Sequence, residues 1–333
     1  MRSGSQVKRC SQSLSARPRI RLFANAVPRP FDPIMHDVII IGGGPAGLSA
    51  ALILARCRRD IVLLDHAKGR NRFAAEMHGY LSRDCIPPSQ FLAHARKDLS
   101  RYSVRCIEDE VMHAHVEPDA TFLVRTQSGK ELRSRKVLLA TGVRDLLPDL
   151  EGFMPCYGKS AHHCPYCDAF EHRDQIIAAY GRGNAAIGIA LALRTWSPSV
   201  TACIDGEVAD AKHLALAKRN NIPIRTEKVA LLEHSEGVLR AVHFTSGPPL
   251  PAQALFFNTG QVQRSDLPRL FGCKFDKNGG IETSDRQCTT VKGLYLAGDA
   301  DKEVQFVIVA AAQGATAAVG INRELQDEDR GTV

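Results

Sequence analysis

Two cysteines separated by two residues carry the most specific chemical signal in this 333-residue chain. They form the motif Cys164-Pro165-Tyr166-Cys167. Two thiols at this spacing can form a disulfide reversibly, and exchange with another thiol requires a thiolate as the attacking group. Cys164 and Cys167 are therefore candidates for a redox-active pair, and the surrounding elements must bring a source or acceptor of electrons to them.

A glycine-rich segment far upstream predicts such an element. The apolar run 37–41 reads as a buried strand and is followed by Gly42-Gly43-Gly44-Pro45-Ala46-Gly47, a helix over 48–55 and a second strand over 61–64 that ends at Asp65. Gly42 permits the tight turn, Gly44 lets a pyrophosphate approach the backbone, and Gly47 lets helix and strand pack closely. The helix N-terminus stabilises phosphates, and Asp65 can accept hydrogen bonds from ribose hydroxyls.

Two further strand ends carry small residues suited to a cofactor. Ala140-Thr141-Gly142 follows the strand expected at 137–139, and Ala297-Gly298-Asp299 follows the strand expected at 293–296. A carboxylate at Asp299 can bind a chain of sugar-like hydroxyls, and its alternative role is to cap the helix expected over 305–325. Both segments are predicted to join the first glycine-rich loop.

A second glycine-rich segment follows the cysteine pair. The strand expected at 176–180 leads into Gly181-Arg182-Gly183-Asn184-Ala185-Ala186, with Gly181, Gly183 and Ala186 in the fingerprint positions, and another strand is expected at 199–204. The order of these units predicts an α/β fold with two Rossmann-like dinucleotide-binding domains, the second inserted into the first. We expect one domain over 36–147 and 276–326 and the inserted domain, with the cysteine pair, over 148–275.

Composition and charge fit an enzyme without a nucleic-acid or membrane role. The chain is 44% hydrophobic and 24% charged with a net charge of +7, but residues 1–34 hold seven cations against one acid, which leaves about +1 for the rest. Residues 1–35 read either as a disordered leader or misassigned start, or as a transit peptide. Of the ten cysteines only Cys164 and Cys167 have close motif spacing and the other eight are scattered, which favours a reducing compartment, the cytoplasm, unless residues 1–34 direct the chain to an organelle.

These motifs and their order resemble the low-molecular-weight thioredoxin reductase family over residues 36–326. The resemblance implies FAD in the split domain, a pyridine nucleotide in the inserted domain and a homodimer. It implies that Cys167 faces the flavin, that Cys164 exchanges with a small thiol or disulfide substrate or a small redox protein, and that Asp168 is the acid/base group. A carboxylate can serve in that way if burial raises its pKa.

The chain departs from the family pattern at the site for the nucleotide phosphate. The family usually has a His-Arg-Arg cluster after the strand that ends here at Ile204, whereas this chain has Asp205-Gly206-Glu207. Asp205 would repel a 2′-phosphate but suits a free pair of ribose hydroxyls, so NADPH is disfavoured, and NADH or a vestigial nucleotide domain remain. Gln305-Phe306-Val307 replaces the usual Arg-Gln-Ala. Segments 71–84 and 162–167 resemble a side branch of dithiol oxidases, which close disulfides in small natural products and pass electrons from FAD to oxygen.

Other chemistries for the same residues are less specific. The cysteine motif also occurs in glutaredoxins, but there it lies near the start of a small domain. His162 and His163 with the two cysteines could hold zinc, yet no second CxxC pair completes four spread ligands, so no metal is predicted. His78, His162 and His163 are either bases toward thiols or packing residues. The expected function is an FAD-dependent thiol–disulfide oxidoreductase; the alternatives are an oxygen-dependent dithiol oxidase without NADPH use and a flavin-bearing redox sensor.

Overall fold

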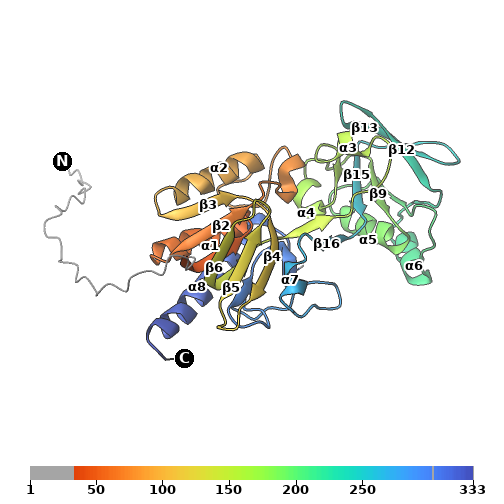
Figure 1. Ribbon diagram of the computed structural model, residues 1–333. Coiled ribbons are helices and arrows are strands. Elements are labelled where there is room, and N and C mark those ends of the chain that lie inside the picture. Colours follow the sequence, from red (N-terminus) through yellow and green to blue (C-terminus); the bar gives the residue numbers. More distant parts are fainter. Residues whose placement is uncertain (1–33, 302–303, 333) are drawn as a thin grey trace, which may run out of the picture. The chain divides into compact units, whose positions relative to one another are not determined.

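A computed structural model describes residues 34–301 and 304–332 of the chain (Figure 1). Its two largest sheets each have parallel strands at their centre. The expectation for residues 1–33 therefore lies outside the described residues. Met35, which the expected division assigned to the leader, is the first residue of strand β1 and pairs with Arg133. Among the described residues, no helix has the length and apolar content needed to cross a membrane.

The first sheet has seven strands, with a parallel centre built from apolar runs and an antiparallel edge. β1 pairs in parallel with β2 and β6, β2 with β3, and β6 with β17, whereas β4, β5 and β6 run antiparallel. The strands are β1 Met35–Ile41, β2 Ile61–Asp65, β3 Val104–Glu108, β4 Val111–Val116, β5 Phe122–Thr126, β6 Glu131–Leu139 and β17 Leu294–Leu296. The central strands are buried on both faces, as parallel strands usually are.

Three long helices accompany this sheet: α1 Pro45–Arg56, α2 Pro88–Leu99 and α8 Val307–Asp329. Small residues let α1 and α8 approach closely, because a side chain on Gly314 would collide with the carbonyl of Ala46. The helix predicted over 305–325 is confirmed, although it begins at Val307 with Phe306 at the N-cap. The capping role considered for Asp299 is therefore wrong.

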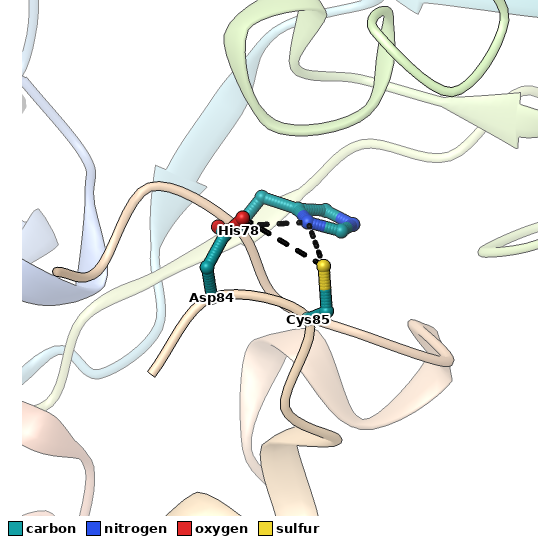
Figure 2. A group of neighbouring side chains, drawn as sticks. All are labelled: His78, Asp84 and Cys85. Atoms are coloured by element: carbon teal, nitrogen blue, oxygen red, sulfur yellow. Dashed lines mark hydrogen bonds and ion pairs between the residues drawn. The ribbon is translucent and has the colours of Figure 1, made fainter. Parts of the chain in front are cut away.

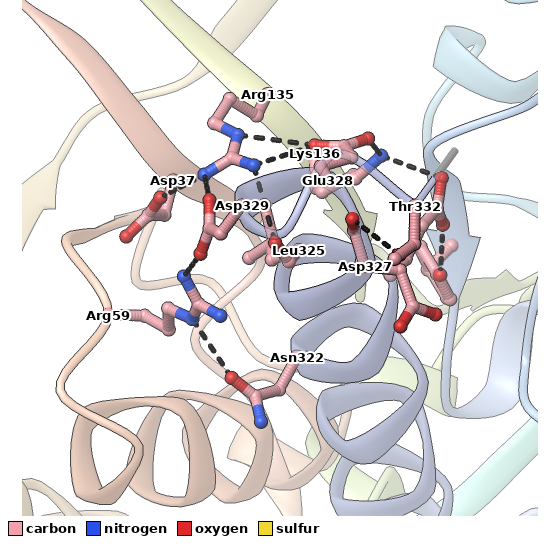
Figure 3. A network of polar contacts seen from close by, with 12 residues as sticks. Asp37, Arg59, Arg135, Lys136, Asn322, Leu325, Asp327, Glu328, Asp329 and Thr332 are labelled. Carbon is pink, nitrogen blue, oxygen red and sulfur yellow. Dashed lines mark hydrogen bonds and ion pairs between the residues drawn. The ribbon is translucent and has the colours of Figure 1, made fainter.

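Charged side chains fix the C-terminal end of α8 to the first sheet (Figure 3). The buried ammonium of Lys136 on β6 lies 2.6 Å from Glu324 and 2.5 Å from Glu328. Neighbouring Arg135 pairs with Glu328 at 2.8 Å and with Asp37 of β1 at 3.1 Å. The last turns of α8 are thus held by cations that β6 supplies, in a setting where an unpaired charge would be costly.

The second sheet has five parallel strands, all of them between β6 and β17 in sequence. Its order is β11-β10-β9-β15-β8, with α5 Asn184–Leu193 packed against β9 and β10 and α6 Ala211–Arg219 next to α5. The strands are β8 Ala161–His162, β9 Ile177–Gly181, β10 Val200–Cys203, β11 Ile224–Arg225 and β15 Ala254–Asn258. A small antiparallel sheet of β12 Val229–Ser235, β13 Val238–Phe244 and β14 Leu250–Pro251 adjoins it. The predicted fold class, two Rossmann-like units with the second inserted into the first, is confirmed.

Two short strands carry the chain between the sheets. β7 Val143–Asp145 leaves the first sheet and pairs with β16 Gln261–Gln263, which follows the second. Beyond β16, Leu267, Phe271 and Cys273 lie in the core of the first sheet, so the boundary expected at residue 276 is too late for them. The remaining short helices are η1 Arg70–Phe73, α3 Phe153–Cys156, α4 Pro165–Asp168, α7 Leu267–Leu270 and η2 Asp299–Asp301.

Candidate active site

The structure brings the first set of predicted cofactor residues together at the N-terminus of α1. Gly42 has a φ of +115°, and a side chain on it would collide with the carbonyl oxygen of Ala140, so the loop presses against the end of β6. A Cβ on Gly298 would lie 3.1 Å from that of Ala46, which places the end of β17 at the start of the helix. The residues brought together are Gly42, Gly44, Pro45, Ala46, Gly47, Asp65, Ala140, Thr141, Gly142, Gly298 and Asp299.

This cluster fits a dinucleotide such as FAD. A Cβ on Gly44 would meet no atom within 4 Å, so the backbone at the helix N-terminus is open to an approaching phosphate. Among the described residues, the buried hydroxyl of Thr141 is one of few polar groups without a hydrogen-bond partner. A bound group that offers both phosphates and hydroxyls would satisfy it. Asp65 accepts a hydrogen bond from Ala67 and pairs with Arg96 at 2.9 Å, and that arginine is half-exposed.

Arg70 on η1 joins this cluster, although no sequence motif marked it as a site residue. Its guanidinium makes two hydrogen bonds to the Asp145 carboxylate, at 2.8 and 2.6 Å, and contacts Asp299 at 2.9 Å and Gln305 at 2.7 Å. Burial opposes both charges, but the hydrogen bonds and charges of the partners raise the pKa of Arg70 and lower the pKa of Asp145. The pair stays ionised and fixes Asp299 beside the loop.

The two cysteines of the motif form a disulfide at the start of α4. Cys164 is the N-cap residue, Cys167 lies in the single turn of helix, and their Cα atoms are 5.3 Å apart. Both are partly exposed, and Tyr166 between them is 74% exposed. The tyrosine ring packs edge-on against Trp196 at 5.4 Å and Phe306 at 6.3 Å. Since the disulfide holds both sulfurs, these cysteines are not arranged as zinc ligands.

A pair of histidines connects Asp168 to the interior. Asp168 lies 3.3 Å from Nδ1 of His162, whose Nε2 is 3.0 Å from Nε2 of His172. Nδ1 of His172 lies 2.9 Å from the side-chain oxygen of Gln175, to which it donates. Burial lowers the pKa of His172, so it is neutral and accepts at Nε2.

His162 therefore contacts Asp168 through one ring nitrogen and His172 through the other, which places it between the carboxylate and the interior. His172 was not predicted, because no spacing rule links residues 162 and 172.

His163 packs against Phe257, whereas His162 packs against Phe256. Burial, reinforced by the positive charge of Arg70, lowers the pKa of His163, while Asp145 and Asp168 act in the opposite direction. This neutral imidazole directly precedes Cys164, so the Arg70–Asp145 pair borders both Asp299 and the residue before the disulfide. His78 does not join the histidine pair and contacts Asp84, Cys85 and Glu171 instead.

The second glycine-rich loop is more enclosed than the first. A Cβ on Gly181 would lie 3.0 Å from the carbonyl oxygen of Asn258 and 2.9 Å from the amide of Ala186, so the tight turn is present. Gly183 is buried, and a Cβ on it would lie 2.7 Å from the carbonyl oxygen of Val208. Asn184 makes two hydrogen bonds to Asp210, at 2.8 and 2.9 Å. The segment 206–210 therefore lies against this loop.

Asp205, which was predicted to face the ribose, already has partners within the protein. Its two carboxylate oxygens accept hydrogen bonds from the Tyr180 hydroxyl at 2.8 Å and the Val229 amide at 3.1 Å. Burial and then this carboxylate raise the pKa of Tyr180. The carboxylate thus joins β9 to β12.

The comparisons with known proteins agree with this arrangement. The model of the pyridine nucleotide-disulphide oxidoreductase family matches residues 36–314. The chain is 32% identical to thioredoxin reductase tcpT of Claviceps purpurea, over 79% of this chain and 86% of that one. It is 29% identical to a thioredoxin reductase of Gibberella zeae, over 87% and 98% of the two chains. Among solved structures, HlmI superposes with a TM-score of 0.87 at 33% identity, over 90% of this chain and 97% of that one.

A match across most of the chain establishes the family and with it a flavoprotein oxidoreductase. The family binds FAD and NAD(P)H, and the first cluster has an open backbone and a hydroxyl without a partner that suit FAD. The chain belongs to the pyridine nucleotide-disulphide oxidoreductase family and is a thioredoxin reductase-like, flavin-dependent disulfide oxidoreductase.

Proposed function

We propose that Cys164 and Cys167 are the redox centre through which this enzyme moves two electrons between FAD and a substrate dithiol or disulfide. The contact chain around Arg70 carries the proposal. Arg70 binds the predicted cofactor residue Asp299, and its partner Asp145 acts electrostatically on His163, the residue before Cys164. Tyr166 of the motif also packs against Phe306, just before α8. These contacts support electron exchange between the disulfide and a flavin held at the first loop.

The exchange steps follow from the accessible disulfide. A substrate thiolate attacks Sγ of Cys164, the bond between the two cysteines breaks, and Cys167 leaves as a thiolate. The second substrate thiolate then attacks the substrate sulfur and releases Cys164, so the substrate disulfide forms and the enzyme holds a dithiol. Bound FAD supplies the two-electron acceptor that restores the Cys164–Cys167 disulfide. In the reductase direction the same bonds form and break in reverse order.

The contact between Asp168 and His162 suits these steps. The leaving Cys167 thiolate is stabilised when a proton is available next to it, and oxidation of the dithiol needs a base in the same place. Asp168 follows Cys167 directly, and the His162–His172 pair extends from it toward Gln175. We assign Asp168 as the acid/base group and His162 as its proton-sharing partner.

A second candidate function, the oxygen-dependent dithiol oxidase, is favoured by the second loop. The backbone carbonyl of Val208 lies against Gly183, where a pyrophosphate would approach, and Asp205 is engaged by Tyr180 and Val229. The carboxylates of Asp205 and Glu207 also follow the strand end where the family usually has cations for a 2′-phosphate. In this direction the net reaction oxidises a dithiol to a disulfide and reduces dioxygen to hydrogen peroxide.

Anaerobic rapid mixing of the FAD-loaded protein separates the candidate functions. We expect dithiothreitol to bleach the flavin absorbance and NADPH to leave it unchanged, with hydrogen peroxide released when air is admitted. Fast bleaching by NADPH would establish a reductase and refute the proposal that the second loop excludes the 2′-phosphate of NADPH. Bleaching by none of NADPH, NADH and dithiothreitol would leave the flavin-bearing redox sensor.

Substitution of one cysteine tests the redox centre itself. Cys167→Ser removes the leaving thiolate, so dithiol-driven flavin reduction should fall by at least about 10³-fold. The matched control is Cys57→Ser, at an exposed cysteine after α1, which should keep the wild-type rate. Full turnover in Cys167→Ser would disprove the assignment.

We also propose the domain bounds, the substrate class, the assembly and the compartment that the sequence predicts. We place the flavin domain at 36–147 and 276–326, extended toward Leu267 by its packing, and the inserted domain between these segments. The substrate is a small thiol or disulfide or a small redox protein, the assembly a homodimer and the compartment the cytoplasm. Sedimentation of the FAD-loaded protein tests the dimer, because a monomer at micromolar concentration would contradict it.

A further inference from the structure

A second group of reactive side chains lies in the loop between residues 77 and 86 (Figure 2). Met77 and Ile86 form an antiparallel bridge, with an N–H···O distance of 2.9 Å, so the loop closes on itself and its first and last residues, His78 and Cys85, become neighbours. The amide of Gly79 donates to the Asp84 carboxylate at 2.8 Å, which fixes that side chain at the same end of the loop.

Three donor groups of different residues converge there. Nδ1 of His78 lies 3.7 Å from Sγ of Cys85 and 3.7 Å from Oδ1 of Asp84, and Sγ lies 3.7 Å from the other oxygen of that carboxylate, Oδ2. With one oxygen taken from Asp84, the three donor atoms all lie within 4.8 Å of one another. Zinc bonds of about 2.0–2.3 Å at tetrahedral angles require separations of roughly 3.4–3.6 Å between ligand atoms, so the imidazole and the thiol are close to the separation that one zinc ion would impose.

The opposite nitrogen of His78 has a partner that would orient the ring. Nε2 lies 3.8 Å from a carboxylate oxygen of Glu171, and the His78 side chain is only 15% exposed. A histidine that binds a metal usually directs its second nitrogen at a carboxylate, which fixes the tautomer that presents the other lone pair. Glu171 lies three residues after Asp168, so it links this loop to the segment of the disulfide.

A catalytic thiol is the other chemistry that such residues could support, with His78 as base and Glu171 as its orienting group. The charges oppose it. The carboxylates of Asp84 and Glu171 lie 3.7 Å from the Cys85 sulfur and 3.8 Å from the His78 imidazole, so like charge would repel a free thiolate here, whereas a nucleophilic cysteine lies beside cations. Carboxylates around a thiol and an imidazole suit a cation.

We propose that His78, Asp84 and Cys85 bind one zinc ion, with Glu171 as the positioning residue for His78. Imidazole, thiolate and carboxylate together form a ligand set that zinc prefers among the common divalent ions. Binding converts the Cys85 thiol to a thiolate and releases one proton to solvent. Asp84 and Cys85 are exposed, so the fourth position is open to water. This site replaces the expectation that the chain has no metal site, and it does not depend on the proposed redox function.

Cobalt is a suitable probe, because its tetrahedral d–d bands lie at longer wavelengths than the flavin absorbance and its thiolate band can be followed as a difference spectrum against the metal-free protein. The FAD-loaded protein, chelator-treated and with the Cys164–Cys167 disulfide oxidised, is titrated with Co²⁺ and then with Zn²⁺. We expect one Co²⁺ per chain, a thiolate-to-cobalt band and displacement by one Zn²⁺. Cys85→Ser should lose the thiolate band, and Cys57→Ser should keep it. Absence of the bands, or the same titration in Cys85→Ser, would overturn the proposal.

Two further variants keep the test decisive if Cys85→Ser disturbs the loop. Asp84→Asn retains an oxygen for the Gly79 amide, so the loop should persist with the thiolate band present and metal affinity reduced. Glu171→Gln should weaken affinity by about 10–100-fold without loss of the cobalt spectrum. Zinc should also slow alkylation of Cys85 and leave that of Cys57 unchanged. Fast alkylation of Cys85 that zinc does not slow would identify a nucleophilic thiol and contradict the site.

Discussion

The two glycine-rich loops of this enzyme have the same residue spacing but different surroundings. Their first glycines are equivalent, because Gly42 lies against the carbonyl of Ala140 and Gly181 against that of Asn258, each at the end of the adjoining strand. Their second glycines differ. Gly44 is partly exposed with open space beside it, whereas Gly183 is buried against the carbonyl of Val208.

The acidic residues that close the second strand of each unit differ in the same way. Asp65 is held by a nearby amide and by the half-exposed side chain of Arg96, which a ligand can displace. Asp205 is held by the buried Tyr180 and by the first amide of β12. In the first unit, glycine and acid remain available to a ligand. In the second unit, the glycine and the acid already contact other parts of the protein, so the glycine-rich fingerprint alone does not require a bound dinucleotide there.

Removal of the buried cation under α8 should have the largest effect on the first unit. Lys136→Met removes the buried ammonium that Glu324 and Glu328 share and leaves Glu328 with Arg135 alone, so the free energy of unfolding should fall by about 3–5 kcal/mol, as denaturant titration measures. Because Gly314 of α8 packs on Ala46, FAD retention should fall as well. The control Lys130→Met, at a half-exposed lysine that lies 3.8 Å from Asp109, should change stability by less than about 1 kcal/mol.

The same network predicts a pH dependence. Burial opposes the charge of Glu328, but the hydrogen bonds and charges of Lys136 and Arg135 lower its pKa below 4.5. A lowered pKa in the folded state gives stability that is present above 4.5 and is lost as the pH falls through the lowered value. The stability difference between the wild type and Lys136→Met should therefore shrink in acid. A difference that is constant down to pH 2 would contradict the ionic role.

Alanine at the second glycine of each loop tests the comparison directly. Gly44→Ala should leave the unfolding free energy of the FAD-free protein within about 1 kcal/mol of wild type, because its Cβ meets no protein atom. FAD affinity should fall at least tenfold, about 1.4 kcal/mol. Gly183→Ala, at a φ of +52° and against Val208, should cost about 1–3 kcal/mol and keep FAD. The reverse pattern would mean that the second loop is the more open one.

Sequence patterns predicted the strands and helices, because these depend on residues that are close together in the chain. The apolar runs of β1, β2, β9 and β10 and the small-residue helices carry local signals, and their bounds agree within a few residues. Arg70 was missed because its partners, Asp145 and Asp299, are 75 and 229 residues away. The ribose role predicted for Asp205 could not account for Tyr180 and Val229, since their hydrogen bonds exist only once β9 and β12 are in place. Asp299 does not cap α8, because this helix begins at Val307 and Phe306 is its N-cap residue.

Replacement of Asp205 asks whether its carboxylate serves the fold or a nucleotide. Asp205→Ala leaves the Tyr180 hydroxyl and the Val229 amide without their acceptor, so unfolding should become easier by about 1–3 kcal/mol. The control Glu207→Ala, at an exposed neighbour, should stay within about 0.5 kcal/mol. Unchanged stability together with loss of NADH binding would instead identify Asp205 as a ribose ligand.

The smallest effect is expected at the contact that keeps segment 206–210 on the second loop. Asn184→Ala removes both hydrogen bonds to Asp210, which are exposed, so global stability should fall by only about 0.5–1.5 kcal/mol. Hydrogen exchange is the more sensitive measurement, because the Asp210 amide loses its acceptor and should exchange faster. If this segment is what excludes a dinucleotide, the variant should gain NADH binding that the wild type lacks. Faster exchange without such a gain would place the obstruction at Val208 and Gly183 themselves, where release of one contact does not open the backbone.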